Sequence, residues 1–107
     1  MTIRYKNAKT DLTTTNATDV FSVPNATTAV IKSILVSEDS GNADTITLTL
    51  TDSASAIFSL FKVKAVSANT TVELLTAPLV LAESEILKAT AATANRLHVV
   101  VSYMEIS

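Results

Sequence analysis

His98 is the only histidine of the chain, and it is the one side chain that could act as a general base near neutral pH. It lies inside an apolar run, and the residues around it supply no carboxylate or nucleophile in a recognisable catalytic spacing. The chain has no cysteine, which excludes disulfides, thiolate metal sites and cysteine nucleophiles. We therefore interpret His98 as a structural or interface residue and expect no enzymatic activity.

Carboxylates gather in two short segments. Glu38, Asp39 and Asp44 surround a turn, and Glu83 and Glu85 precede an apolar pair. A Ca²⁺ ion needs about six to eight oxygen ligands, and neither spacing matches the calcium loop of an EF-hand. We interpret both segments as charged turns, and we expect neither a metal nor another cofactor.

A regular alternation of threonine with aliphatic residues runs from Thr45 to Thr51. It predicts a strand with one hydroxyl face and one apolar face. One threonine row indicates the solvent side of an ordinary strand, since an ice-binding surface needs several parallel rows. With a single glycine and a net charge of −2, the chain also lacks phosphate-binding glycine loops and the basic excess that nucleic acids require.

The elements that carry these residues are predicted to be strands of one domain, given a length of 107 residues. Short runs of β-branched and aromatic residues alternate with turn signals, which predicts an all-β, antiparallel, jelly-roll-like β-sandwich of about eight strands. Strands are expected at 19–23, 28–37, 45–51, 56–66, 70–75, 79–81 and 97–106, with a weaker one within 9–14. Gly41 lies between the runs 28–37 and 45–51, so these two are expected to form a hairpin.

The segment 82–95 is compatible with either a helix or a strand. Its alanines and a possible N-cap at Ser84 favour a helix by propensity. Its apolar spacing makes a poor helical stripe, because only Ile86 and Leu87 are large. We favour a short strand beginning near Glu85.

Both faces of two predicted strands are apolar. In the run 97–106, one face carries residues such as Val99 and Tyr103, and the other carries Val100, Met104 and Ile106. In the run 29–37, Ile31 and Leu35 are expected to lie opposite Val30, Ile34 and Val36. Because a monomer rarely exposes so large an apolar surface, we expect a cyclic homo-oligomer that associates through Val100, Met104 and Ile106. The alternative is that a loop of the same chain covers this face.

The first nine residues differ in composition from the rest. Arg4, Lys6 and Lys9 precede the first acidic residue. We interpret residues 1–9 as an N-terminal arm before a single domain at 10–107. Either the arm is a frayed terminus, or Ile3, Arg4, Tyr5 and Lys6 dock on a neighbouring subunit or an acidic partner. We expect no signal peptide and no membrane segment, since no apolar leader opens the sequence and no apolar run approaches about 20 residues.

The overall pattern resembles a known group of proteins. The run Val20 to Ile34 is similar to the start of the small β-sandwich virion proteins of tailed bacteriophages, and 78–81, 86–88 and 99–106 are similar to how these proteins end. Members often carry a glycine before the strand that corresponds to 86–90, where this chain has Ser84 and Glu85.

The resemblance implies a structural protein of the virion, made in the host cytoplasm. Its expected form is a homotrimer that decorates or cements a capsid, with the major capsid protein as its partner. A tail or fibre adaptor that binds tail proteins is the first alternative. A carbohydrate-binding module of a host-attachment device is the second, and it belongs to a different functional class.

Overall fold

The computed structural model describes residues 1–107 and contains nine strands in two antiparallel sheets. The first sheet has the order β1-β9-β3-β6, with β7 also paired to β3; its strands are β1 (Ile3–Asp11), β3 (Thr28–Glu38), β6 (Thr71–Glu73), β7 (Leu79–Leu81) and β9 (Leu97–Ile106). The second sheet has the order β2-β8-β4-β5; its strands are β2 (Thr18–Ser22), β4 (Asp44–Thr51), β5 (Ile57–Val66) and β8 (Ile86–Ala91). No helix is long and apolar enough to cross a membrane.

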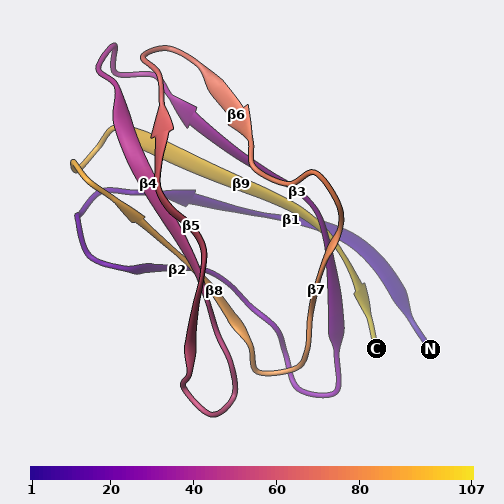
Figure 1. The fold of residues 1–107 in the computed structure, drawn as a ribbon. Helices are drawn as coiled ribbons and strands as arrows, with labels where there is room; N and C mark the ends of the chain where they lie inside the picture. The colour runs from indigo at the N-terminus through magenta and orange to yellow at the C-terminus, as the bar shows by residue number, and fades with distance from the viewer.

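The two sheets enclose one hydrophobic core, so the predicted all-β sandwich is confirmed. Twenty buried apolar residues from both sheets form this core, and the fully buried Ile34, Leu48, Leu87 and Val99 are among them. In β9 every second residue is buried, which leaves the alternate side chains on the outer face of the first sheet. Figure 1 shows β1, in indigo, and β9, in yellow, running side by side across the molecule.

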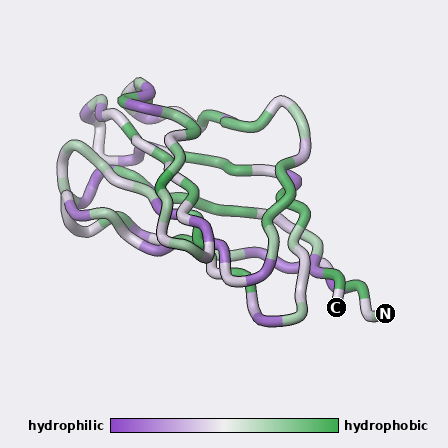
Figure 2. Tube along the Cα trace, turned by 60° about the horizontal axis from the view of Figure 1, so that its bottom comes forward, coloured by the Kyte–Doolittle hydropathy of each residue, from purple (hydrophilic) through white to green (hydrophobic).

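The chain termini lie next to each other at one end of the first sheet. Thr2 and Ser107 exchange two backbone hydrogen bonds, of 2.7 and 2.9 Å. Figures 1 and 2 show this end projecting from the rest of the molecule. The inner side of β1 is therefore left without a covering strand near Arg4 and Lys6, which are both exposed.

The segment 82–95 contains strand β8 and no helix, which confirms the strand prediction. The weaker strand expected within 9–14 is wrong in position, because β1 spans Ile3–Asp11 and pairs with β9 at all nine residues. The boundary drawn between an arm at 1–9 and a domain at 10–107 therefore falls inside a continuous strand.

The hairpin expected between 28–37 and 45–51 is also wrong. β3 belongs to the first sheet and β4 to the second, so the turn between them crosses from one layer to the other. Gly41 does adopt the positive φ expected of it, at 85°. Glycine in a turn therefore predicted the reversal of the chain but not the strand that follows as its partner.

A β-bulge changes which residues of β3 share a face. Its register against β9 shifts between Ile31 and Ser33. Ile31, Ile34 and Val36 are consequently all buried, whereas Val30 and Leu35 point outward. The strict two-residue alternation assumed for this strand grouped Ile31 with Leu35, which is wrong because the bulge inserts one extra residue.

Candidate interaction surface

A row of apolar side chains crosses four strands on the outer face of the first sheet. Tyr5 of β1 lies opposite Met104 of β9, Met104 lies opposite Val30 of β3, and Val30 lies opposite Val80 of β7. Residues directly opposite in antiparallel strands point to the same side of a sheet. Tyr5 is 79% exposed and Val80 is 61% exposed, so the ends of this row are largely open to solvent.

A second pair extends the row toward the chain termini. Ile3 lies opposite Ile106 on the same face, and Ile3 is 49% exposed. We call the set of Ile3, Tyr5, Val30, Val80, Met104 and Ile106 the apolar face. It joins side chains from four strands that are far apart in the sequence.

The outer face of the second sheet is different. There Thr47 of β4 lies opposite Thr90 of β8, and Thr49 lies opposite Lys88 of β8 and Ser59 of β5. Lys88 also lies 3.7 Å from Asp19 of β2. Apolar side chains reach this surface at two separate places: Ile57 and Ile86 flank Thr51, and the exposed Val63 and Ala65 lie near Thr47 and Thr45. The sandwich therefore has one mainly polar outer face and one with a continuous apolar patch.

The structure brings together two sets of residues that the sequence analysis treated separately. Ile3 and Tyr5, predicted for the arm, meet Met104 and Ile106, predicted for self-association. Val100 points to the same side but lies farther along β9, between Lys9 of β1 and Leu35 of β3. Nothing in the sequence alone assigned Val30 or Val80 to this surface; the cross-strand register was needed.

Arg4 and Lys6 lie on the opposite side of β1. Lys6 forms an ion pair with Glu105 of β9, with 2.9 Å between Nζ and Oε1. Arg4 lies directly opposite Glu105 in the strand register. Next to them, burial raises the pKa of the Tyr103 hydroxyl, and the charge of Glu105 adds to this rise while that of Lys6 opposes it. Strand β1 therefore carries Arg4 and Lys6 on its inner side and the apolar Ile3 and Tyr5 on its outer side.

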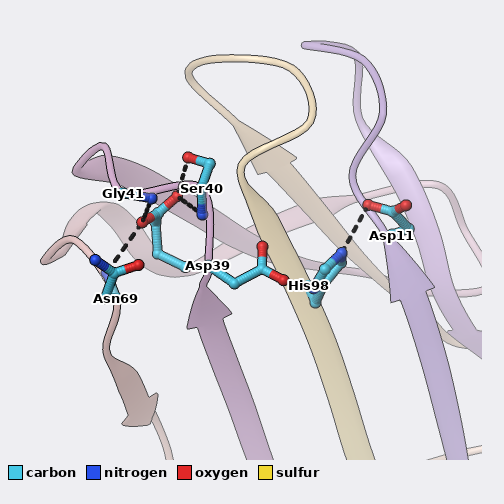
Figure 3. Close-up of polar contacts among 7 residues, drawn as sticks. Asp11, Asp39, Ser40, Gly41, Asn69 and His98 are labelled. Carbon is cyan, nitrogen blue, oxygen red and sulfur yellow. Dashed lines mark hydrogen bonds and ion pairs between the residues drawn. The ribbon is translucent and has the colours of Figure 1, made fainter.

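His98 lies between two carboxylates, which sequence spacing did not reveal. Its Nε2 is 3.3 Å from Asp11 of β1, and its Nδ1 is 3.7 Å from Asp39, which follows β3 (Figure 3). Ser37 is its cross-strand neighbour and helps line a shallow depression of about 500 Å³. Both ring nitrogens are directed at carboxylates, so neither is aimed at the Ser37 hydroxyl as a serine nucleophile would require.

Glu38 organises the turn that joins the two sheets. Its carboxylate accepts hydrogen bonds from the Ser40 hydroxyl and from the backbone N–H groups of Ser40, Gly41 and Asn69 (Figure 3). Burial by itself raises the pKa of Glu38, but these hydrogen bonds outweigh it and lower the pKa from 4.5 to about 2. The carboxylate therefore fastens the β3–β4 turn to the loop between β5 and β6.

Most other carboxylates also accept backbone hydrogen bonds in turns. Asp52 accepts from Ala54 and Ala56, Glu85 accepts from Ala82, and Glu83 accepts from Ala26. Asp44 accepts from Thr93 across the second sheet. No group of three or more His, Cys, Asp and Glu residues is arranged to hold a metal ion. In the charged turns predicted around Glu38 and Glu83, the carboxylates fix the conformation of the loops through these hydrogen bonds.

No family model matches the chain, and neither a curated protein nor a solved structure matches it. Function is therefore inferred from the surfaces described above.

Proposed function

We propose that this protein is a non-enzymatic structural protein that assembles through the apolar face. The observation that carries the proposal is the contrast between the two outer faces of the sandwich. An antiparallel sheet normally packs one face on the core and exposes polar side chains on the other, and β4 shows this alternation. On the first sheet the outer side instead presents Tyr5, Met104, Val30 and Val80 in one row, which favours contact with another protein surface.

The outer face of the first sheet as a whole, with the apolar face at one end of it, has nearly the size of a stable interface. β1, β3 and β9 have nine to eleven residues each, and β6 and β7 lie beside β3, so strands about 4.8 Å apart that rise about 3.3 Å per residue span roughly 20 by 30 Å. This area of about 600 Å² approaches the roughly 800 Å² that each partner buries in a stable protein interface. A homo-oligomer, with a trimer as the expected form, would cover the same face on every subunit.

The strand order supports a jelly roll. β6 and β7 both pair with β3 and are separated by a segment containing Pro78, which cannot donate a backbone hydrogen bond. Leu74, just after β6, also donates to Ile34 of β3 at 2.9 Å. If β6 and β7 are counted as one interrupted strand, the sandwich has eight strands in two sheets of four. Jelly rolls of this size serve as viral capsid and lectin domains.

Combined with the resemblance to phage virion proteins, these features favour a capsid decoration or cement protein located in the virion, with the major capsid protein as its partner. A tail or fibre adaptor uses the same surfaces and is the first alternative. Copy number separates the two: cryo-EM of the particle gives a number comparable to that of the shell protein for decoration, and one set by the tail symmetry for an adaptor.

A carbohydrate-binding module is the second alternative, and one observation bears on it directly. Tyr5 is an exposed aromatic side chain of the kind on which sugar rings stack. Its neighbours Ile3 and Met104 offer no hydrogen bonds to sugar hydroxyls, and only Asn7, next to it on the same side of β1, is polar. The geometry therefore favours a protein partner.

Sedimentation equilibrium of the purified chain tests the proposal. Assembly through the apolar face predicts a mass that is a multiple of 11.3 kDa at micromolar concentration. Val80→Ser, which places a hydroxyl at the β7 end of the face, is expected to shift the mass toward that of the single chain. A monomer at every concentration, or glycan-array binding that depends on Tyr5, would overturn it.

A further inference from the structure

Strand β1 has one free side from Ile3 to Lys9. Thr2 and Ser107 exchange backbone hydrogen bonds, and Leu12 donates to Leu97 at 3.0 Å. Between these two pairs the register of β1 and β9 has no irregularity. Because hydrogen-bonded pairs alternate in an antiparallel ladder, the even-numbered residues of β1 bond to β9 and the odd-numbered ones face outward. The N–H and C=O groups of Ile3, Tyr5, Asn7 and Lys9 therefore point away from the sheet.

The other sheet edges are protected against strand addition. β6 and β7 have three residues each, and β2 has five residues with a register shift. β5 is long, but its register against β4 shifts twice and Val63 has a φ of 52°. Short strands and bulges are the means by which proteins prevent unwanted pairing at edges. β1, with nine residues in regular register, is the one edge without them.

The side chains of β1 define what can pair with it. Its outer side presents Ile3 and Tyr5, and its inner side presents Arg4 and Lys6, which the second sheet leaves exposed. β1 holds three of the eight basic residues and one acidic residue, whereas the rest of the chain has five basic and nine acidic residues. Glu105 of β9 pairs with Lys6 and offsets one of these charges, but the edge still carries an excess of positive charge on an otherwise acidic molecule, which attracts negative charge.

A second copy of β1 is a poor partner for this edge. Antiparallel pairing of two such strands would bring Arg4 and Lys6 of both copies to the inner side of the seam and Lys9 of both copies to its outer side, with only Asp11 of each to offset them. A better partner is a segment that places acidic side chains opposite Arg4 and Lys6 on the inner side. On the outer side its apolar side chains would extend the row of Ile3 and Tyr5. Such a segment alternates acidic and apolar residues.

We propose that β1 accepts an extended, acidic and apolar alternating segment of a partner protein as an additional strand of the first sheet. This inference rests on the proposed function as an assembly protein. It assigns the partner that differs from this chain to the edge of β1, and copies of this chain to the apolar face. The added strand takes its affinity from the four outward residues of the β1 backbone and its specificity from the charges.

A short peptide of alternating Val and Glu is the probe, and one of alternating Val and Lys is its matched control. Amide hydrogen exchange, followed by NMR on the full chain, gives the exchange rate of each backbone N–H group. The Val–Glu peptide is expected to slow exchange at Ile3, Tyr5, Asn7 and Lys9 and to leave the even-numbered amides, already bonded to β9, unchanged. The Val–Lys peptide is expected to have no effect. Equal protection by both peptides, or protection that does not alternate, would overturn the inference.

Asn7→Pro removes an outward N–H group without removing a hydrogen bond to β9, so the sandwich is expected to remain folded. It should weaken binding of the Val–Glu peptide by about tenfold or more, since a donor is lost at the centre of the edge. Asn7→Ala, which keeps the N–H, should bind as the unchanged chain does. Equal affinities of the two variants would contradict strand addition.

Val80→Ser separates this inference from the proposed function. Val80 lies on β7, away from the edge of β1. The variant is expected to lose self-association and to keep the alternating protection by the Val–Glu peptide. Self-association without peptide binding refutes only the edge, and peptide binding without self-association refutes only the apolar face.

Discussion

Truncation of Tyr5 to alanine should weaken assembly far more than it affects folding. Tyr5 is 79% exposed, so the single chain gains little from it, and Tyr5→Ala is expected to change the free energy of unfolding by less than about 1 kcal/mol. Full burial of a large apolar side chain contributes about 1.5 to 3 kcal/mol. Covering the exposed part of Tyr5 in an interface is therefore worth about 2 kcal/mol, or about 30-fold in the association constant for each Tyr5 buried.

Sedimentation equilibrium gives the association constant, and urea unfolding of the same samples gives the stability. Ile57→Ala is the matched control, because Ile57 is 68% exposed on the outer face of the other sheet. It should leave association unchanged. If Tyr5→Ala left the association constant as it is, or if both variants lowered it equally, the assignment of assembly to the apolar face would be refuted.

Three further predictions concern the fold that holds these surfaces. Leu48→Ala, at a fully buried position in β4, should cost about 2 to 5 kcal/mol of unfolding free energy, measured by urea denaturation. Val63→Asn should stabilise the protein by about 1 kcal/mol in the same assay, because a β-branched residue at a φ of 52° is strained and asparagine tolerates it. The pKa of Glu38 is lowered in the folded state from 4.5 to about 2, so its carboxylate stabilises the fold fully above about pH 4.5 and progressively less as the pH falls toward 2. Glu38→Gln should flatten that part of a stability-against-pH curve, and an unchanged slope would show that the carboxylate is not held as described.

Much of the fold follows from local pattern. Seven strands were predicted within about three residues of their observed bounds, because two-residue periodicity and turn residues are local properties. The partners of those strands were not predictable in the same way. The glycine turn after β3 predicted a reversal, but whether β4 pairs with β3 or crosses to the other sheet depends on the whole core.

The candidate surface could be predicted only in part, for two physical reasons. Met104 and Ile106 were found because β9 is regular, so simple alternation places them outside. Val30 was grouped with buried residues because the bulge at Ile31 to Ser33 reverses the alternation in mid-strand. The arm was misjudged because its basic, weakly apolar sequence does not look like a strand; β9, paired with it at every residue, supplies the ladder that makes it one.

The distribution of polar groups gives the strongest reason to place function on surfaces rather than in a site. Glu38, Asp44, Asp52, Glu83 and Glu85 all accept backbone hydrogen bonds in loops, and the only histidine is directed at two carboxylates. These six titratable groups are thus engaged in holding the strands and loops in place. The apolar face and the backbone of β1 have no internal partner, and both are satisfied by another polypeptide chain rather than by a small molecule. Since these two surfaces lie on the same sheet but require different chemistry, one can join like copies while the other binds an unlike partner.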